Sequence, residues 1–170
     1  MSATPDFSIA QFVGCIALAF GVSAFQMRTR VSVLAVMATA NAFWALHFLL
    51  LGAYTGAALN LVSIARNAMF MRWKDRYPGP LLPAVVIAVL AGAAIATWRG
   101  PLSGVALTAA VCATIAFWQR HPRNTRRWSL LSSPLWLTHN ALQGSYPGII
   151  IEVLVLGSIL IGMWRHDRQQ

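Results

Sequence analysis

Acidic residues are scarce in this sequence, which has four Asp and Glu against thirteen Lys and Arg in 170 residues. Charged residues of both signs make up 10% of the chain, whereas soluble domains carry roughly 25%. This deficit excludes an ordinary soluble domain. The chain also lacks a Ser/His/Asp arrangement, an HExxH motif and paired carboxylates inside its apolar segments, so we expect no enzyme.

Cysteine is nearly absent as well. Cys15 and Cys112 each lie in the middle of an apolar segment. Two isolated thiols make neither a probable disulfide framework nor a metal site, so we expect both to be small buried apolar side chains. No cofactor is expected from this composition.

Long apolar segments are what the sequence has in abundance, with 58% hydrophobic residues. A helix needs about 20 apolar residues to cross a hydrocarbon core of roughly 30 Å. Pro134 interrupts one segment and is expected to kink it, which could make a hinge. The pattern predicts seven membrane-spanning helices, at residues 8–27, 31–51, 54–72, 81–98, 102–118, 129–143 and 147–164.

The net charge of +9 could indicate a nucleic-acid binder, but the basic residues cluster at the ends of apolar segments rather than on one face. Such residues fix orientation in a membrane and contact anionic lipid headgroups. Arginines follow the first, third, fifth and seventh segments, and Arg99 is the one loop cation on the opposite side. We therefore predict a multi-pass protein of the bacterial inner membrane, with the N-terminus outside and the C-terminus in the cytoplasm.

A thirteen-residue pattern occurs twice, as Trp-x-x-His-x-x-Leu-x-Gly-x-Tyr-x-Gly. The first copy runs from Trp44 to Gly56 and the second, 92 residues later, runs from Trp136 to Gly148. Trp, His, Gly and Tyr do not replace one another as apolar filler, so the match indicates a duplication. Internal repeats within a membrane domain are typical of transporters.

The shift of 92 residues maps the first three segments onto the last three and leaves the fourth without a counterpart. Three helices leave the chain on the side of the membrane opposite to its start, and a single linker helix brings it back. The second three-helix unit therefore starts on the same side as the first, so the two halves should have the same orientation in the membrane. We predict an all-α membrane protein with two parallel three-helix bundles, at residues 1–76 and 100–170, joined by a linker helix at residues 77–99.

Two stretches, residues 45–67 and 138–160, resemble the YgjV-type family of bacterial inner-membrane proteins. In the first stretch the residues that carry the resemblance are His47, Leu50 to Gly52, Tyr54, Asn60 and Arg66, and in the second they are His139, Asn140, Gly144 and Glu152. The 3+1+3 plan is also similar to that of the SWEET sugar transporters and their PQ-loop and PnuC relatives. That resemblance implies a central path, with substrate contacted by polar residues on the third helix of each bundle. Asn60 and Glu152, which are 92 residues apart, match such positions.

Glu152 is the only acidic residue inside an expected span. A carboxylate within a membrane is costly unless it faces a cavity or a partner, so it indicates either proton coupling or a bond between helices. Asn60 shares a helix face with Gly56, Ser63 and Asn67, and this stripe should line either a path or a helix contact. Arg66 is expected to point away from the stripe and snorkel to the cytoplasmic surface, with a role as counter-ion to an anionic substrate as the alternative.

His47 and His139 should flank the pseudo-symmetry axis near the outer surface. They are candidates for a gate, a proton relay, a ligand pair for haem or metal, or simple packing. Trp44 and Trp136 lie one turn deeper and should pack together or stack on a solute. The favoured function is passive or proton-coupled transport of a small polar solute through a path between the bundles. The candidate residues are Asn60, Glu152, Trp44, Trp136, His47, His139, Ser63, Asn67 and Asn140.

The alternative function is a membrane protein without transport activity that binds a cofactor through the histidines or a partner subunit. The expected partners are membrane lipid and a small-molecule solute, with a homo-oligomer possible and no nucleic acid.

Overall fold

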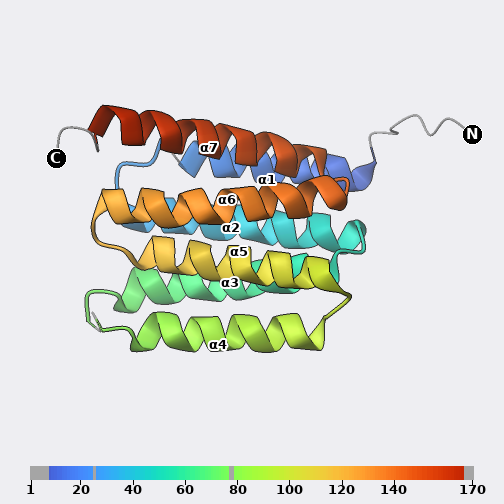
Figure 1. The fold of residues 1–170 in the computed structure, drawn as a ribbon, viewed down its shortest axis with the longest axis horizontal. Coiled ribbons are helices and arrows are strands. Elements are labelled where there is room, and N and C mark those ends of the chain that lie inside the picture. The colour runs from blue at the N-terminus through green and yellow to red at the C-terminus, as the bar shows by residue number, and fades with distance from the viewer. Residues whose placement is uncertain (1–7, 25, 77–78, 167–170) are drawn as a thin grey trace, which may run out of the picture.

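The computed structural model describes residues 8–24, 26–76 and 79–166, and within them the chain forms seven α-helices and no strand. The all-helical fold class is thereby confirmed. In chain order, the helices are α1 (Ile9–Ala24), α2 (Arg30–Leu50), α3 (Tyr54–Trp73), α4 (Leu81–Ala96), α5 (Pro101–Trp118), α6 (Pro122–Leu142) and α7 (Tyr146–His166) (Figure 1).

The sixth helix starts earlier than its hydropathy indicated. The expected start at residue 129 is wrong, because α6 begins at Pro122 and includes the basic residues that were assigned to a loop. Proline is well suited to the first turn of a helix, where a missing N–H has no partner to lose. The helix continues through Pro134, whose carbonyl oxygen accepts a 2.9 Å hydrogen bond from the Thr138 hydroxyl.

The two copies of the repeated pattern end their helices in the same way. Gly52 follows α2 with φ 72°, and Gly144 follows α6 with φ 69°. At each end the residue after the glycine donates to a carbonyl five residues earlier, namely Ala53 to Phe48 and Ser145 to Asn140. This is the Schellman arrangement, which needs a left-handed residue at the position of the glycine. The geometry accounts for the glycine in the Leu-x-Gly part of the pattern.

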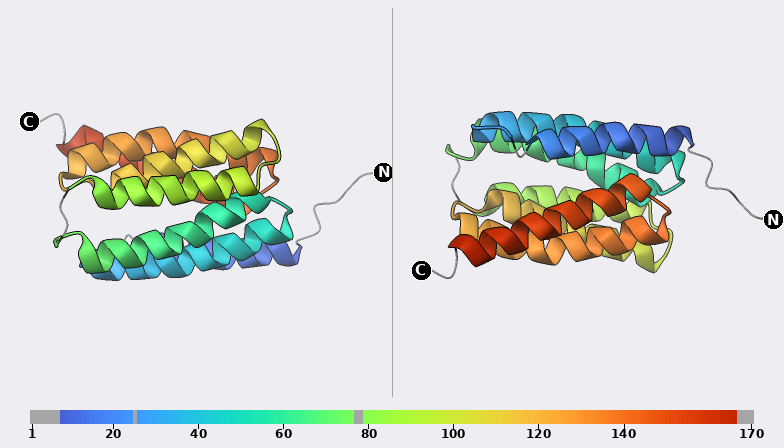
Figure 2. Two further views of the ribbon diagram at one scale, coloured as in Figure 1. Left: turned by 90° about the horizontal axis from the view of Figure 1, so that it is seen from below. Right: turned by 90° about the horizontal axis from the view of Figure 1, so that it is seen from above.

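The helices form two layers. α2 packs between α1 and α3 in one layer, and α6 packs between α5 and α7 in the other. The layers contact each other through α3 with α5 and through α1 with α7, while α4 packs against α3 and α5. Figure 2 shows the layers close together at the end that carries the α2–α3 and α6–α7 turns, here called the hairpin end, and spread apart at the opposite end. That opposite end carries the α3–α4 and α5–α6 connections and most of the arginines, and is called the basic end.

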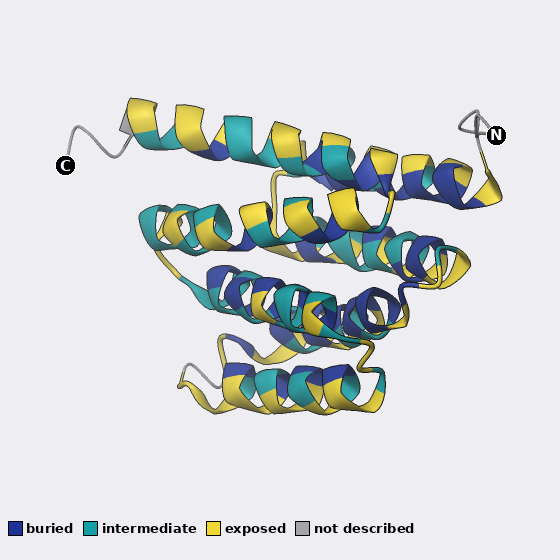
Figure 3. Cartoon of the chain, turned by 45° about the vertical axis from the view of Figure 1, so that its right-hand side comes forward, coloured by how far each residue is buried: buried dark blue, intermediate teal, exposed yellow. Residues whose placement is uncertain are grey.

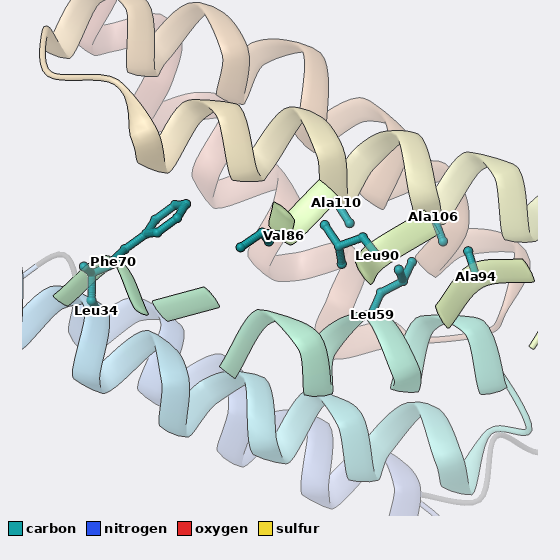
Figure 4. Close-up of a cluster of buried hydrophobic side chains, with 8 residues drawn as sticks. All are labelled: Leu34, Leu59, Phe70, Val86, Leu90, Ala94, Ala106 and Ala110. Carbon is teal, nitrogen blue, oxygen red and sulfur yellow. The ribbon is translucent and has the colours of Figure 1, made fainter. Parts of the chain in front are cut away.

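The main apolar core lies among α3, α4 and α5 (Figure 4). Leu59 and Leu90 are completely buried there, and Ala94 and Ala106 let the helices approach closely. Phe70 extends the core toward the basic end, where its ring packs 4.9 Å from that of Trp118. This cluster fixes α3 against α5 and therefore sets one edge of the space between the layers.

The outer surface is rich in apolar side chains, on α7 above all (Figure 3). Three helices, α2, α5 and α7, are long and apolar enough to cross a membrane, and α1 and α4 are shorter apolar helices. Exposed Ile, Leu and Val in such numbers are what lipid contact requires. Cys15 also lies on an exposed face, with Phe12 and Ala19 on the same side of α1, so its expected burial is wrong, whereas Cys112 is buried.

Candidate functional site

A cavity of about 500 Å³ lies between the two layers, with walls from α1, α2, α3, α5, α6 and α7. It begins beside Phe48 and Trp136 near the hairpin end and reaches Thr125 and Arg126 near the start of α6, at the basic end. Its size is that of a small-molecule site. The polar side chains that line it are Asn41, Asn60, Ser63, Arg66, Thr125, Arg126, Ser129, Ser132, Ser133, Asn140, Glu152 and Ser158.

Aromatic rings close the cavity at the hairpin end. The Phe48 ring stacks on Trp136 across the layers, with centroids 6.2 Å apart, and meets His139 edge-on at 5.2 Å. Trp44 stacks on the other side of Phe48 at 6.0 Å. Phe48 is 3% exposed, so its ring is packed between the layers at this end. We call these three rings, Trp44, Phe48 and Trp136, the aromatic plug.

Each tryptophan of the repeated pattern contacts its own histidine in the same way. The Trp44 and His47 rings meet at 5.4 Å and 77°, and the Trp136 and His139 rings meet at 5.4 Å and 88°. A Trp and a His three residues apart lie on one helix face, which allows this edge-on contact. The repeated sequence thus gives a repeated structure, although the two histidines have different surroundings.

His47 is fully buried and joins three helices. Its Nδ1 lies 2.6 Å from the carbonyl oxygen of Ala10, and its Nε2 lies 2.7 Å from the hydroxyl oxygen of Ser145. A carbonyl oxygen can only accept, so Nδ1 carries the hydrogen, and in the neutral ring Nε2 accepts from Ser145. Gly14 makes room for the ring, because a Cβ there would lie 2.8 Å from Nδ1. His47 therefore packs as a structural joint outside the cavity wall.

His139 is equally buried but less well bonded, since its Nδ1 has no hydrogen-bond partner among the described residues. Its ring packs against Gly56, where a Cβ would lie 3.0 Å from Cε1. It lines a second, smaller cavity of about 90 Å³ that also contains Arg99 and Ser103. Each histidine thus reaches the hairpin turn of the other layer.

The predicted pair Asn60 and Glu152 does meet in one cavity, from opposite layers. The side-chain amide of Asn60 donates to the Gly56 carbonyl at 2.9 Å, and Glu152 forms a side-chain hydrogen bond with Ser133. Ser63 also lines the cavity, as do Trp44, Trp136 and Asn140.

Asn67 has a different place from the one expected. It is fully buried and does not line the cavity, but its side-chain oxygen accepts hydrogen bonds from Nε and from one terminal nitrogen of Arg66, both at 3.1 Å. His47 and His139 are likewise absent from the wall of the main cavity.

The expectation for Arg66 is wrong. Arg66 is 3% exposed, lines the cavity with Asn60 and Ser63, and does not reach the surface. Residues 60, 63 and 66 are three apart and share a helix face, so the spacing alone could have placed Arg66 beside Asn60 and Ser63. Asn41 and Ser133, which also line the cavity, are 92 residues apart, and extending the repeat outside the thirteen-residue pattern would have found them.

Metal binding finds no support in the donor set, because the described residues contain no cluster of three or more His, Cys, Asp or Glu. His47 has hydrogen bonds at both ring nitrogens, so neither is available to haem or a metal without breaking one of them.

Three features define an integral membrane protein of the helical class. They are apolar helices long enough to cross a membrane, a lipid-compatible surface, and a cavity between the layers that has polar side chains in its wall. The chain belongs to the Imp-YgjV family, described as bacterial inner membrane protein, whose model matches residues 8–170. It is similar to the inner membrane protein YgjV of Escherichia coli strain K12, with 25% identity over 164 residues, which cover 95% of this chain and 87% of that protein. No solved structure matches the chain.

Proposed function

We propose that the protein transports a small polar solute across the inner membrane, through the cavity between the two layers. The observation that carries this proposal is the cavity itself, whose largely apolar wall carries polar side chains from both layers. It reaches the basic end and ends against the aromatic plug at the other end. A membrane protein with only a structural role would gain nothing from a space of about 500 Å³ inside its fold.

The proposed architecture is the 3+1+3 arrangement of parallel repeats, with all seven helices crossing the membrane. Three features support it: the equivalent helix ends at Gly52 and Gly144, the equivalent Trp–His contacts, and the packing of α4 outside both layers. We place the basic end in the cytoplasm, because loop arginines remain on that side of a membrane. The cavity then faces inward, and the plug with its histidines is the outer gate.

Transport by this arrangement requires the cavity between the layers to open alternately at the basic end and at the hairpin end. The contacts at the hairpin end would separate while the basic end closes, so that one layer rocks against the other around the polar residues at the centre. Pro134 on α6, which has lost one backbone hydrogen bond, is the proposed flexing point.

Glu152 is the proposed proton carrier. It is the one carboxyl group among the described residues of the cavity wall, and it forms a side-chain hydrogen bond with Ser133. A carboxyl group that can be reached alternately from each side couples proton movement to the motion of the layers.

Purified protein in liposomes tests the proposal. With radiolabelled solutes from several chemical classes, a proton gradient should drive accumulation of at least one solute in wild-type vesicles. Glu152→Gln should abolish this accumulation while leaving downhill exchange and the folded amount unchanged, and Glu152→Asp should retain part of it. If no class of solute moves in either protein, the transport proposal is wrong.

A further inference from the structure

Arg66 is a buried cation whose hydrogen bonds, in the part of the chain that the structure describes, all go to neutral side chains. Its three bonds run to Asn67 and Thr114, the latter at 3.3 Å from one terminal nitrogen. The guanidinium also lies 4.9 Å from the centroid of the Phe117 ring. Burying a charge is costly without a charged partner, so an anion bound beside this guanidinium would be stabilised.

The hydrogen bonds of Arg66 leave part of the guanidinium free to bind a ligand. The group has five N–H donors, and the three bonds to Asn67 and Thr114 account for three of them. The bonds to Asn67 use the edge formed by Nε and one terminal nitrogen, so the remaining donors belong to the two terminal nitrogens. When Thr114 accepts the hydrogen that points away from the other terminal nitrogen, the two remaining N–H groups lie side by side and match the two oxygens of a carboxylate.

The rest of the cavity complements a carboxylate that has an apolar body. The side-chain nitrogen of Asn41, on the neighbouring helix, has no hydrogen-bond partner within residues 8–24, 26–76 and 79–166, so it supplies a further donor. Trp44 and Trp136 give an aromatic wall toward the hairpin end. Arg126 lines the cavity near the start of α6, at the basic end.

We propose that the cavity takes small organic carboxylates and that Arg66 binds their carboxylate group end-on. This inference rests on the proposed function, because it names the class of substrate that the same cavity would transport. Binding can nevertheless be measured without transport. Phosphate monoesters fit less well, since a doubly charged group would call for more than one cation at its position.

Thermal unfolding of the purified full-length protein in a neutral detergent gives a direct test. The probes are sodium benzoate and sodium propionate, compared with benzamide, propionamide, inorganic phosphate, sodium chloride at equal ionic strength and vesicles of phosphatidylglycerol. Benzoate and propionate should raise the unfolding temperature in a concentration-dependent way, and the two amides should not. Benzoate should bind more tightly than propionate, because it also contacts the aromatic wall.

Two variants assign the effect to Arg66. Arg66→Lys keeps the charge but loses the paired donors, so the apparent affinity for benzoate should fall by about tenfold or more. Thr114→Val removes one group that holds the guanidinium in place and should weaken binding in the same direction. Arg99→Lys, a cation outside the main cavity, is the matched control and should bind benzoate as the wild type does.

The outcomes separate this inference from the proposed function. Equal stabilisation by benzoate and benzamide in the wild type would overturn the inference, even if Arg66→Lys fails to fold. Stabilisation by phosphate or by phosphatidylglycerol alone would overturn it as well. Binding of benzoate through Arg66 without uptake in liposomes would support the inference and count against transport. Uptake of uncharged solutes alone would support transport and count against the inference.

Discussion

The Nε2 atom of His47 lies 2.7 Å from the hydroxyl oxygen of Ser145, a residue 98 positions away in the sequence. Ser145 precedes α7, and its hydroxyl oxygen also accepts the backbone N–H of Gly148 at 3.2 Å, which caps the helix. A chain of hydrogen bonds thus runs from α7 through Ser145 and His47 to the Ala10 carbonyl in α1. This joint holds the two layers together at the hairpin end.

Replacing Ser145 by alanine should weaken the joint. The variant loses a helix cap and leaves the buried Nε2 of His47 without a partner, so we expect a loss of about 1–2 kcal/mol in the free energy of unfolding. Thermal unfolding in detergent measures it. Thr108→Ala is the control, because that exposed hydroxyl bonds only within its own helix, and it should change little. Equal effects in the two variants would count against the joint.

Gly14→Ala should disturb the same joint from the other side. The added Cβ would lie 2.8 Å from Nδ1 of His47 and 3.0 Å from Pro147, neither of which can move without shifting a neighbouring helix. We expect destabilisation by about 1–3 kcal/mol. Gly92→Ala on α4 meets nothing within 4 Å and should be neutral or stabilise by about 0.5–1 kcal/mol. A Gly14→Ala variant as stable as wild type would show that His47 is held less firmly than its distances imply.

Cysteine labelling tests the direction in which the cavity opens. In a background with Cys15→Ala and Cys112→Ala, we expect Ser129→Cys and Ser158→Cys to react with a membrane-impermeant maleimide from the cytoplasmic side, because both residues line the cavity, Ser129 half-buried and Ser158 exposed. Leu142→Cys, beside the α6–α7 turn, should react from the outside. The reverse pattern would invert the proposed orientation, and reaction of all three from one side would refute it.

Lys74, which follows α3 at the basic end, should make stability depend on pH. Its ammonium donates to the carbonyls of Phe117 and Gln119 at 3.4 and 3.0 Å, which are the last acceptors of α5. Burial, together with the nearby charges of Arg30 and Arg120, lowers the pKa of Lys74 to about 8. In the unfolded chain the pKa is about 10.4, so the unfolded state binds more protons between these values.

Stability should therefore rise with pH from about 8 to about 10, where the folded protein no longer pays for the buried charge. The measurement is the unfolding temperature across this range. Lys74→Gln should flatten the slope relative to the wild type, whereas Arg72→Gln, an exposed cation of the same region, should not. Identical slopes in all three proteins would remove Lys74 as the cause.

Hydropathy and short-range rules were enough to predict the helices. Six of the seven expected segments match a helix to within a few residues, because apolar runs, first-turn prolines and helix-ending glycines act locally. The predicted start of α6 was wrong because hydropathy marks only the apolar part of a helix. The backbone hydrogen bonding of α6 continues into the polar residues before that part. The site residues that the repeat related, Asn60 and Glu152, do share the cavity wall, and the repeat pointed to them because it places equivalent positions around one axis.

What the sequence by itself determined is the all-helical class, the membrane setting and the duplicated hairpin from Trp to Gly, since each depends on residue type and spacing along one segment. Only the tertiary structure decided that Arg66 turns inward and that Phe48 stacks between the layers. It also decided that His47 bonds to Ser145, whereas Nδ1 of His139 meets no hydrogen-bond partner among the described residues. These facts depend on which helices face each other. The repeated pattern is the same in both halves, so it cannot predict that the two histidines have different surroundings. Those surroundings are set by tertiary contacts and by positions where the halves differ, such as Phe48 and its equivalent Asn140.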